Sequence, residues 1–111
     1  MGYISANIIP AKFAANTNTT QYTASGVIAV LNKFTATNVS ASTATLTVYL
    51  VPKAETAANS NMIIQARQIA AGECYTCPEI VGHALNDGGF IVTLASASNS
   101  IVIRASGVEI S

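Results

Sequence analysis

Two cysteines and a histidine are the residues of this sequence best suited to chemistry. Cys74 and Cys77 form a C-x-x-C pair, and His83 follows six residues later. A structural zinc site needs four ligands, so this group is one ligand short. A redox pair of this spacing lies at the start of a helix in a βαβ unit, and no helix is predicted here.

The expected backbone also argues against a disulfide between the two cysteines. The segment 74–80 is predicted to be a strand that returns after the turn at residues 71–73. Residues three apart on a strand point to opposite faces and lie about 10 Å apart, at ~3.3 Å per residue. A disulfide needs Cα atoms closer than about 7 Å. We therefore expect two free cysteines, one buried and one near the surface.

His83 and Asp87 are the only histidine and the only aspartate. A Cys77-His83-Asp87 triad can be drawn, but no G-x-S-x-G element supports nucleophilic catalysis. We expect a turn histidine that is exposed or caps a neighbour.

Two carboxylates and a glycine pair complete the search for chemistry. Glu73 and Glu79 would share one strand face, where the simpler interpretation is a pair of solvated edge charges. Gly88-Gly89 lacks the helix and lysine of a phosphate loop. The sequence thus predicts no catalytic, cofactor-binding or metal-binding residue, and a protein that is not an enzyme.

The charge content is unusually low for a domain of this size. The 111 residues suit one domain, 1–111, and only ten residues are charged, 9% against a typical ~25%. The net charge is zero and the pI about 6.5. The five basic residues are scattered and do not alternate with aromatics, so we expect no nucleic-acid partner.

Small neutral residues replace the missing charge. The chain has ten Ser, twelve Thr, nine Asn and nineteen Ala, and half of its residues are hydrophobic. Such a surface loses little side-chain entropy when a partner covers it. This favours a surface rich in interfaces, and a homo-oligomer; the alternative is a monomer with few charges.

Long uncharged stretches, such as 34–52 and 88–103, raise the question of a membrane. Thr, Ser and Asn recur within them every two or three residues, so neither is a continuous apolar helix. The N-terminus has neither the basic region nor the long apolar core of a secretory signal. We expect a soluble protein made in the cytoplasm, with no membrane partner.

The hydrophobic pattern has a period of two, which is typical of strands. Residues 43–51 alternate, with Leu46, Val48 and Leu50 on one face. The run after Gly26 is predicted to place Ile28, Val30, Phe34 and Ala36 on a common face. The polar segment 38–42 is predicted to join these two strands into a hairpin.

The last strand changes parity. Its apolar residues are odd-numbered up to Ala105 and even-numbered at Val108 and Ile110, so a β-bulge at Ser106-Gly107 is expected to keep them all inward. Seven to eight short strands predict an all-β fold, an antiparallel β-sandwich or jelly roll. Residues 1–20 are less patterned and are either part of the domain or an extended N-terminal arm.

Five segments between Tyr22 and Ile110, about four fifths of the chain, carry a family resemblance. They are Tyr22–Gly26, Thr45–Pro52, Ile69–Glu73, Pro78–His83 and Ser106–Ile110. Together they resemble small β-sandwich virion proteins of tailed double-stranded DNA bacteriophages, of the capsid decoration or tail-accessory type. These segments are strands and turns, so they specify a fold better than a role.

The resemblance implies a structural protein without catalytic residues. It would be a decoration (cement or staple) protein that binds the outside of the major capsid protein lattice, alongside copies of itself, and resides in the virion. A neck or tail adaptor, or a tail-associated module that binds the host or a glycan, remains the alternative. Four Tyr and no Trp argue against a glycan site.

Overall fold

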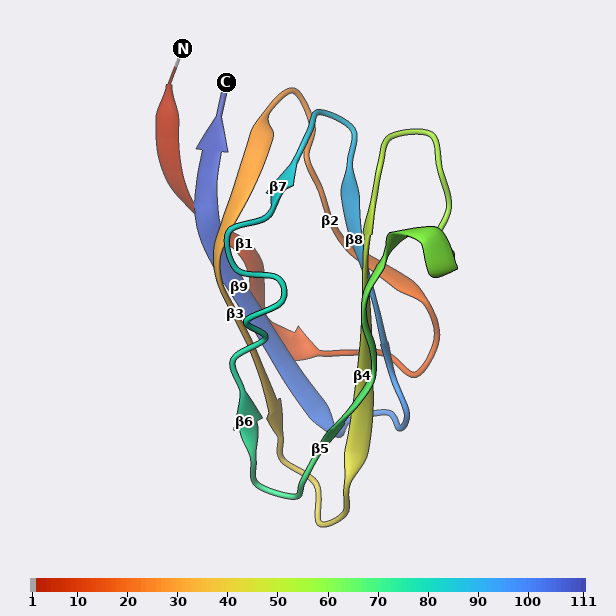
Figure 1. Ribbon diagram of the computed structural model, residues 1–111. Helices are drawn as coiled ribbons and strands as arrows, with labels where there is room; N and C mark the ends of the chain where they lie inside the picture. The colour runs from red at the N-terminus through yellow and green to blue at the C-terminus, as the bar shows by residue number, and fades with distance from the viewer. Residues whose placement is uncertain (1) are drawn as a thin grey trace.

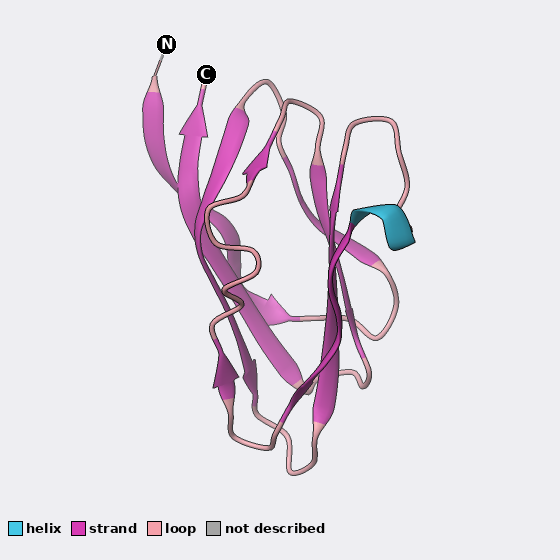
Figure 2. Ribbon diagram, viewed as in Figure 1, coloured by secondary structure: helices cyan, strands magenta, loops and turns pink. Residues whose placement is uncertain are grey.

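The protein is described by a computed structural model of residues 2–111; Met1, the first residue of the 1–20 segment, lies outside the described residues. The described chain is all-β, with nine strands and one short 3-10 helix, η1 (Figure 2). The elements are β1 (Tyr3–Phe13), β2 (Thr19–Thr23), β3 (Ile28–Asn38), β4 (Ala44–Val51), η1 (Asn59–Asn61), β5 (Met62–Ile69), β6 (Cys74–Tyr75), β7 (Ala84–Leu85), β8 (Phe90–Ala95) and β9 (Ile101–Ile110).

The strands form two antiparallel sheets that face each other (Figure 1). The first sheet has the order β1-β9-β3-β6, with β7 also paired to β3, and the second has the order β2-β8-β4-β5. The main hydrophobic cluster lies between the sheets, and Phe34, Ile103 and Leu46 are among its fully buried side chains. The expected antiparallel β-sandwich is confirmed.

Strand β4 follows its sequence pattern. Leu46 and Val48 lie in the core and Leu50 packs against it, so the predicted inward face is confirmed. Alternate residues of a strand point to opposite faces, which places Tyr49 and Val51 on the outer face of the second sheet.

The expected hairpin between β3 and β4 is wrong, because the two strands belong to different sheets. Residues 39–43 cross from one sheet to the other around the buried Asn38 side chain. Its Nδ2 donates to the carbonyls of Ser42 and Ile69, both at 2.8 Å, and its Oδ1 accepts the Ser40 N–H at 2.9 Å. A side chain that satisfies three backbone groups holds a sheet-to-sheet crossing that hydrophobic alternation does not reveal.

The segment for which the sequence allows an extended arm begins with a long strand of the sandwich. Residues 3–13 form β1, which pairs with β9 at the edge of the first sheet. The N- and C-terminal segments lie side by side at one end of the molecule (Figure 1), where Gly2 and Ser111 exchange two backbone hydrogen bonds.

The expected parity change in β9 is also wrong. Ile101, Ile103, Ala105 and Gly107 are all buried, so β9 keeps its odd-numbered residues inward to that point. The extra residue lies in the neighbouring β3, where Leu31 opposes Gly107 and Lys33 opposes Ser106, leaving Asn32 without a counterpart. Strand β1 is likewise irregular between Ala6 and Ile9.

Because of this bulge, it is β3 that changes parity. Ala29 and Leu31 are buried before it, and Phe34 and Ala36 after it. Ile28 and Val30, predicted to share a face with Phe34, therefore point to the outer side of the sheet.

Candidate functional site

The C-x-x-C segment adopts a different backbone from the expected strand. Strand β6 ends at Tyr75, and Cys77 has a left-handed φ of 49°. Both cysteines are free, Cys74 exposed and Cys77 buried, which confirms the predicted pair of thiols in unlike surroundings. The broken strand also separates Glu73 from Glu79, so these carboxylates share no strand face: Glu73 Oε1 accepts the N–H of Ala70 within its own turn.

The surroundings of Cys77 disfavour reaction at its sulfur. Burial, with the charge of Glu79 and the neighbouring Cys74 adding to it, raises the pKa of the Cys77 thiol to about 12. The thiolate is the reactive and metal-binding form of cysteine, so Cys77 stays protonated near neutral pH. It packs as a small apolar side chain of the core.

Glu79 belongs to a surface cluster rather than to a catalytic pair. The Tyr75 hydroxyl donates to both carboxylate oxygens of Glu79, at 2.5 and 2.6 Å, and the guanidinium of Arg67 lies over the Tyr75 ring at 4.2 Å from its centre. The hydrogen bond from Tyr75 lowers the pKa of Glu79, while burial and this bond raise the pKa of Tyr75 to about 12. Both groups thus keep their ordinary charge states near pH 7, and the cluster ties β5 to the loop after β6.

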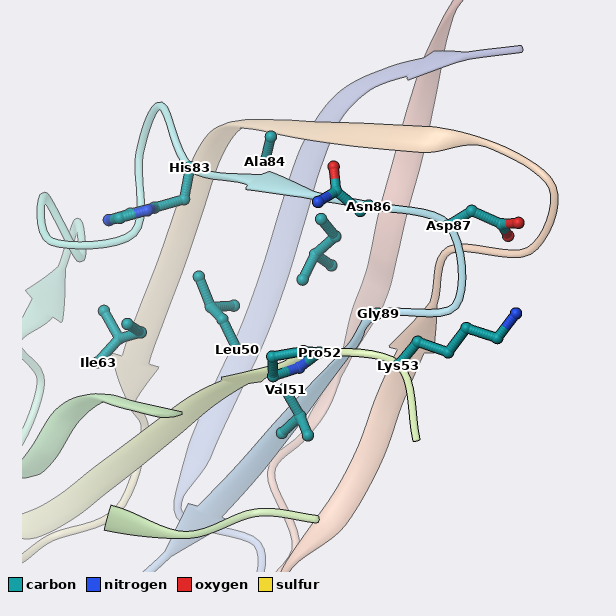
Figure 3. Close-up of a pocket in the computed structure, with 11 residues that line it drawn as sticks. Leu50, Val51, Pro52, Lys53, Ile63, His83, Ala84, Asn86, Asp87 and Gly89 are labelled. Carbon is teal, nitrogen blue, oxygen red and sulfur yellow. The ribbon is translucent and has the colours of Figure 1, made fainter. Parts of the chain in front are cut away.

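His83 and Asp87 line one cleft of about 490 Å³ between β4–β5 and the segment around β7. Figure 3 shows them at opposite ends of this cleft, with their side chains pointing apart. Ile63 lies on the His83 side of the cleft and Leu50 nearer its middle, and Cys77 is not among the lining residues. Asp87 Oδ1 instead accepts the N–H of Gly26 at 2.8 Å, closing the end of the sandwich. The Cys77-His83-Asp87 arrangement is therefore not assembled.

Over residues 2–111, no group of three or more His, Cys, Asp or Glu side chains is arranged to hold a metal ion. The same part of the chain contains no helix long and apolar enough to span a bilayer. The side chains of Glu73, Glu79 and Asp87 make separate local hydrogen bonds and converge on no common site.

A different feature stands out on the outer face of the first sheet. Directly opposed residues of paired strands share a face, and the register places Tyr3, Ile110 and Ile28 in one row. The next row on the same face contains Ser5, Val108 and Val30. We call the five apolar members of these rows the outer patch: Tyr3, Ile28, Val30, Val108 and Ile110.

The outer patch is open to solvent at its edges and half-buried at its centre. Tyr3 is 72% exposed and Ile28 42%, whereas Val30, Val108 and Ile110 have intermediate exposure. The three strands that carry it, β1, β9 and β3, lie side by side next to the chain termini (Figure 1). Isolated exposed apolar residues are ordinary, but a contiguous group rimmed by polar residues is typical of an interaction site.

Gly107 allows β9 to pass close to β3 at the bulge below the outer patch. A Cβ at this position would lie 2.0 Å from the carbonyl oxygen of Val30, which no side chain tolerates. Glycine therefore holds the two strands together where Asn32 distorts the ladder, and keeps Val30 and Val108 in one surface.

The charged residues near the outer patch follow the alternation of side chains between the two faces of a strand. Lys33 and Arg104 lie on the outer face beyond the patch, opposite Ser106 and Thr35 respectively. Glu109, between Val108 and Ile110, points the other way, and its Oε2 accepts a hydrogen bond from the hydroxyl of Tyr22 in the second sheet at 2.5 Å. Burial and the carboxylate of Glu109 raise the pKa of Tyr22. The outer patch itself thus contains no charged group.

Sequence reasoning missed the outer patch because it turned Val108 and Ile110 inward and put Ile28 and Val30 on the same face as Phe34, which is buried. The available signal was the adjacent polar pair Asn32-Lys33 inside an apolar strand, which interrupts the period of two and marks a bulge. With the bulge placed there, Ala29 and Leu31 become the inward residues and Ile28 and Val30 the outward ones.

Comparison with known proteins adds no further information: no protein-family model matches the chain, and no curated protein or solved structure is significantly similar to it.

Proposed function

We propose that this protein is a non-enzymatic structural subunit of a tailed-bacteriophage virion, a decoration protein that binds the outside of the capsid shell and stabilises it. The observation that carries the proposal is the outer patch. The sequence resemblance to phage β-sandwich proteins supplies the kind of assembly. The few charges of the chain, ten in 111 residues, agree with a surface made to be covered.

The outer patch suits a flat, apolar partner surface. It is built from three adjacent strands of one sheet, so its backbone is fixed before binding and little conformational entropy is lost on association. Burial of apolar area yields roughly 25 cal/mol per Å², and no charge has to leave water at the patch centre. Lys33 and Arg104, at its margin, set the orientation of the subunit.

Binding of this kind is expected to depend little on salt. Screening acts on exposed charges over about 10 Å at 0.1 M salt, whereas apolar contacts are not weakened by salt and are weakened by urea or guanidinium. We therefore expect subunits to stay on particles in 1 M NaCl and to leave them in denaturant before the shell itself dissolves.

The test is the number of copies per particle in virions purified by density gradient and quantified by mass spectrometry. Hundreds of copies, retained through a high-salt wash, are expected for a shell decoration protein. A dozen copies or fewer per particle would contradict the decoration role and favour a neck or tail adaptor. Absence from particles, or release by moderate salt, would contradict the proposed mechanism.

A further inference from the structure

The free edge of β1 has a defined set of outward-pointing backbone groups. In an antiparallel ladder, hydrogen-bonded pairs alternate with pairs that are not hydrogen-bonded. Gly2 and Ser111 exchange both backbone hydrogen bonds, and the register is regular from there to the pair of Ala6 with Gly107. Tyr3 and Ser5 therefore belong to the alternate pairs, and their N–H and C=O groups point away from β9.

This stretch of edge lacks the features that usually prevent strand addition. Edges are normally blunted by charges, prolines, bulges or covering segments. In β1 the first proline is Pro10, the first charge is Lys12, and the first bulge follows Ala6. Residues 3–6 thus form a regular, uncharged edge to which the described residues 2–111 add no further strand.

The side chains of this edge are also uncovered. Ile4 is 62% exposed although its register partner Glu109 points toward the second sheet, because Ile4 lies at the margin of the sandwich. Tyr3, on the opposite face, is 72% exposed. An exposed isoleucine beside free backbone donors and acceptors is typical of a strand that receives another strand.

We propose that β1 pairs antiparallel with β1 of a second copy of this chain, about a two-fold axis that passes at Ile4. Tyr3 of each copy then lies opposite Ser5 of the other, and these two pairs exchange four backbone hydrogen bonds. The two Ile4 side chains meet in the pair that is not hydrogen-bonded, where Cα atoms lie about 4.5 Å apart.

A second copy suits this edge because the edge is complementary to itself. No like charges approach each other, since residues 2–11 contain none, and a two-fold axis pairs the free groups of Tyr3 and Ser5 reciprocally. The pairing also joins the first sheets of the two copies, so the two outer patches become one continuous apolar surface. The bulge after Ala6 and Pro10 keep the contact short, so we expect a weak, concentration-dependent dimer.

This inference deepens the proposed function by naming one partner, and it rests on that proposal only in treating the chain as an assembly subunit. Its tests use purified protein without particles, so a failure here leaves the outer patch untouched, and loss of the virion role leaves the edge pairing standing.

The first test is a register-specific cross-link. Ile4→Cys, made with Cys74→Ser to remove the exposed native thiol, should form a disulfide-linked dimer with diamide, because the expected Cα separation is within the range of about 4.4–6.8 Å for disulfides. Val39→Cys in the same background is the control, since Val39 is 56% exposed and lies beyond the far end of β3. Equal dimer yields from the two variants would overturn the proposal.

The second test measures association by sedimentation velocity over a range of concentrations. Ser5→Pro removes an N–H that points to the free edge and none that pairs with β9, so it should abolish the dimer without unfolding the domain. Ile4→Lys should do the same through charge repulsion at the axis, whereas Val39→Lys should dimerise as the wild type does. A wild type that stays monomeric at millimolar concentration, or dimers that persist in Ser5→Pro, would contradict edge pairing.

Discussion

The outer faces of the two sheets carry similar apolar side chains but differ in what covers them. On the second sheet, Tyr49, Val51 and Val92 are buried, because Ala57 and other residues of the chain itself pack over them. On the first sheet, the outer patch has no such cover, and Tyr3 is 72% exposed.

The difference lies in the connections between strands. Between β4 and β5 the chain forms a loop from Pro52 and then the 3-10 helix η1. Met62, the first residue of β5, packs against Tyr49 and its neighbours. No described connection folds over the outer face of β1 and β9 in this way (Figure 1). An apolar face that its own chain covers stabilises the fold, whereas one left open is available to a partner.

The largest expected effect compares one tyrosine from each outer face. Tyr49→Ala should lower the free energy of unfolding by about 3 kcal/mol, since it leaves a cavity beneath Ala57. Tyr3→Ala should change it by less than about 0.5 kcal/mol, because its side chain is mostly in solvent. Urea unfolding of both variants measures the difference, and equal losses would show that the two faces are not distinct.

The second expected effect concerns the close approach that supports the outer patch. Gly107→Ala should cost about 2 kcal/mol, because its Cβ meets the Val30 carbonyl at 2.0 Å and forces β3 and β9 apart. Ser106→Ala, one residue away and on the outer face, should cost less than about 0.5 kcal/mol. Thermal unfolding of the two variants provides the comparison; a stable Gly107→Ala protein would mean that the strands separate at no cost.

The third expected effect concerns the hydrogen bond between Tyr22 and Glu109, which joins the two sheets behind the outer patch. Tyr22→Phe should cost about 1–2 kcal/mol near pH 7, since Glu109 loses its hydrogen-bond donor. The pKa of Tyr22 is raised above its ordinary value of 10.0, so the folded state keeps a proton that the unfolded state loses. The stabilisation is then complete below pH 10 and declines as pH rises above it.

Denaturant unfolding between pH 7 and 11 tests this sign. The wild type should lose its advantage over Tyr22→Phe as pH rises beyond 10, whereas the difference should stay constant from pH 7 to 9. A difference that grows with alkaline pH would contradict the assigned hydrogen bond.

The smallest expected effect is on the outer patch itself. Ile28→Lys should change the free energy of unfolding by no more than about 0.5 kcal/mol, because Ile28 is 42% exposed and lies at the margin of β3. Calorimetry measures it directly. A loss above 2 kcal/mol would assign Ile28 to the fold rather than to an interface.

The sequence was sufficient where one strand kept one parity. The alternation of β4, the fold class and the unlike surroundings of the two cysteines all follow from local pattern and spacing. Hydrophobic alternation was insufficient to orient β3 and β9, because a row of apolar residues has the same sequence pattern whether it faces a core or a partner. With Val108 and Ile110 expected inward, the bulge was predicted in β9, whereas Asn32 of β3 is the extra residue.

The crossing at Asn38 and the turn at Cys77 were missed for another reason. Both depend on a single residue in an unusual setting, a buried amide that bonds both sheets and a left-handed φ of 49°. The hydrogen bonds of Asn38 join residues distant in sequence, and the turn at Cys77 depends on the energy of one backbone conformation. Hydrophobic periodicity carries information about neither.

The most direct test of the central claim, that the outer patch is the surface bound in the assembly, compares two matched lysine variants. Ile28→Lys and Val39→Lys each place a charge on an exposed aliphatic position, at opposite ends of β3. Particles assembled with each protein are purified and the subunit copies counted by mass spectrometry. We predict that Val39→Lys is incorporated at the wild-type copy number and Ile28→Lys at less than about a tenth of it, as a loss of 1.4 kcal/mol or more requires. Equal incorporation of the two variants would contradict the account.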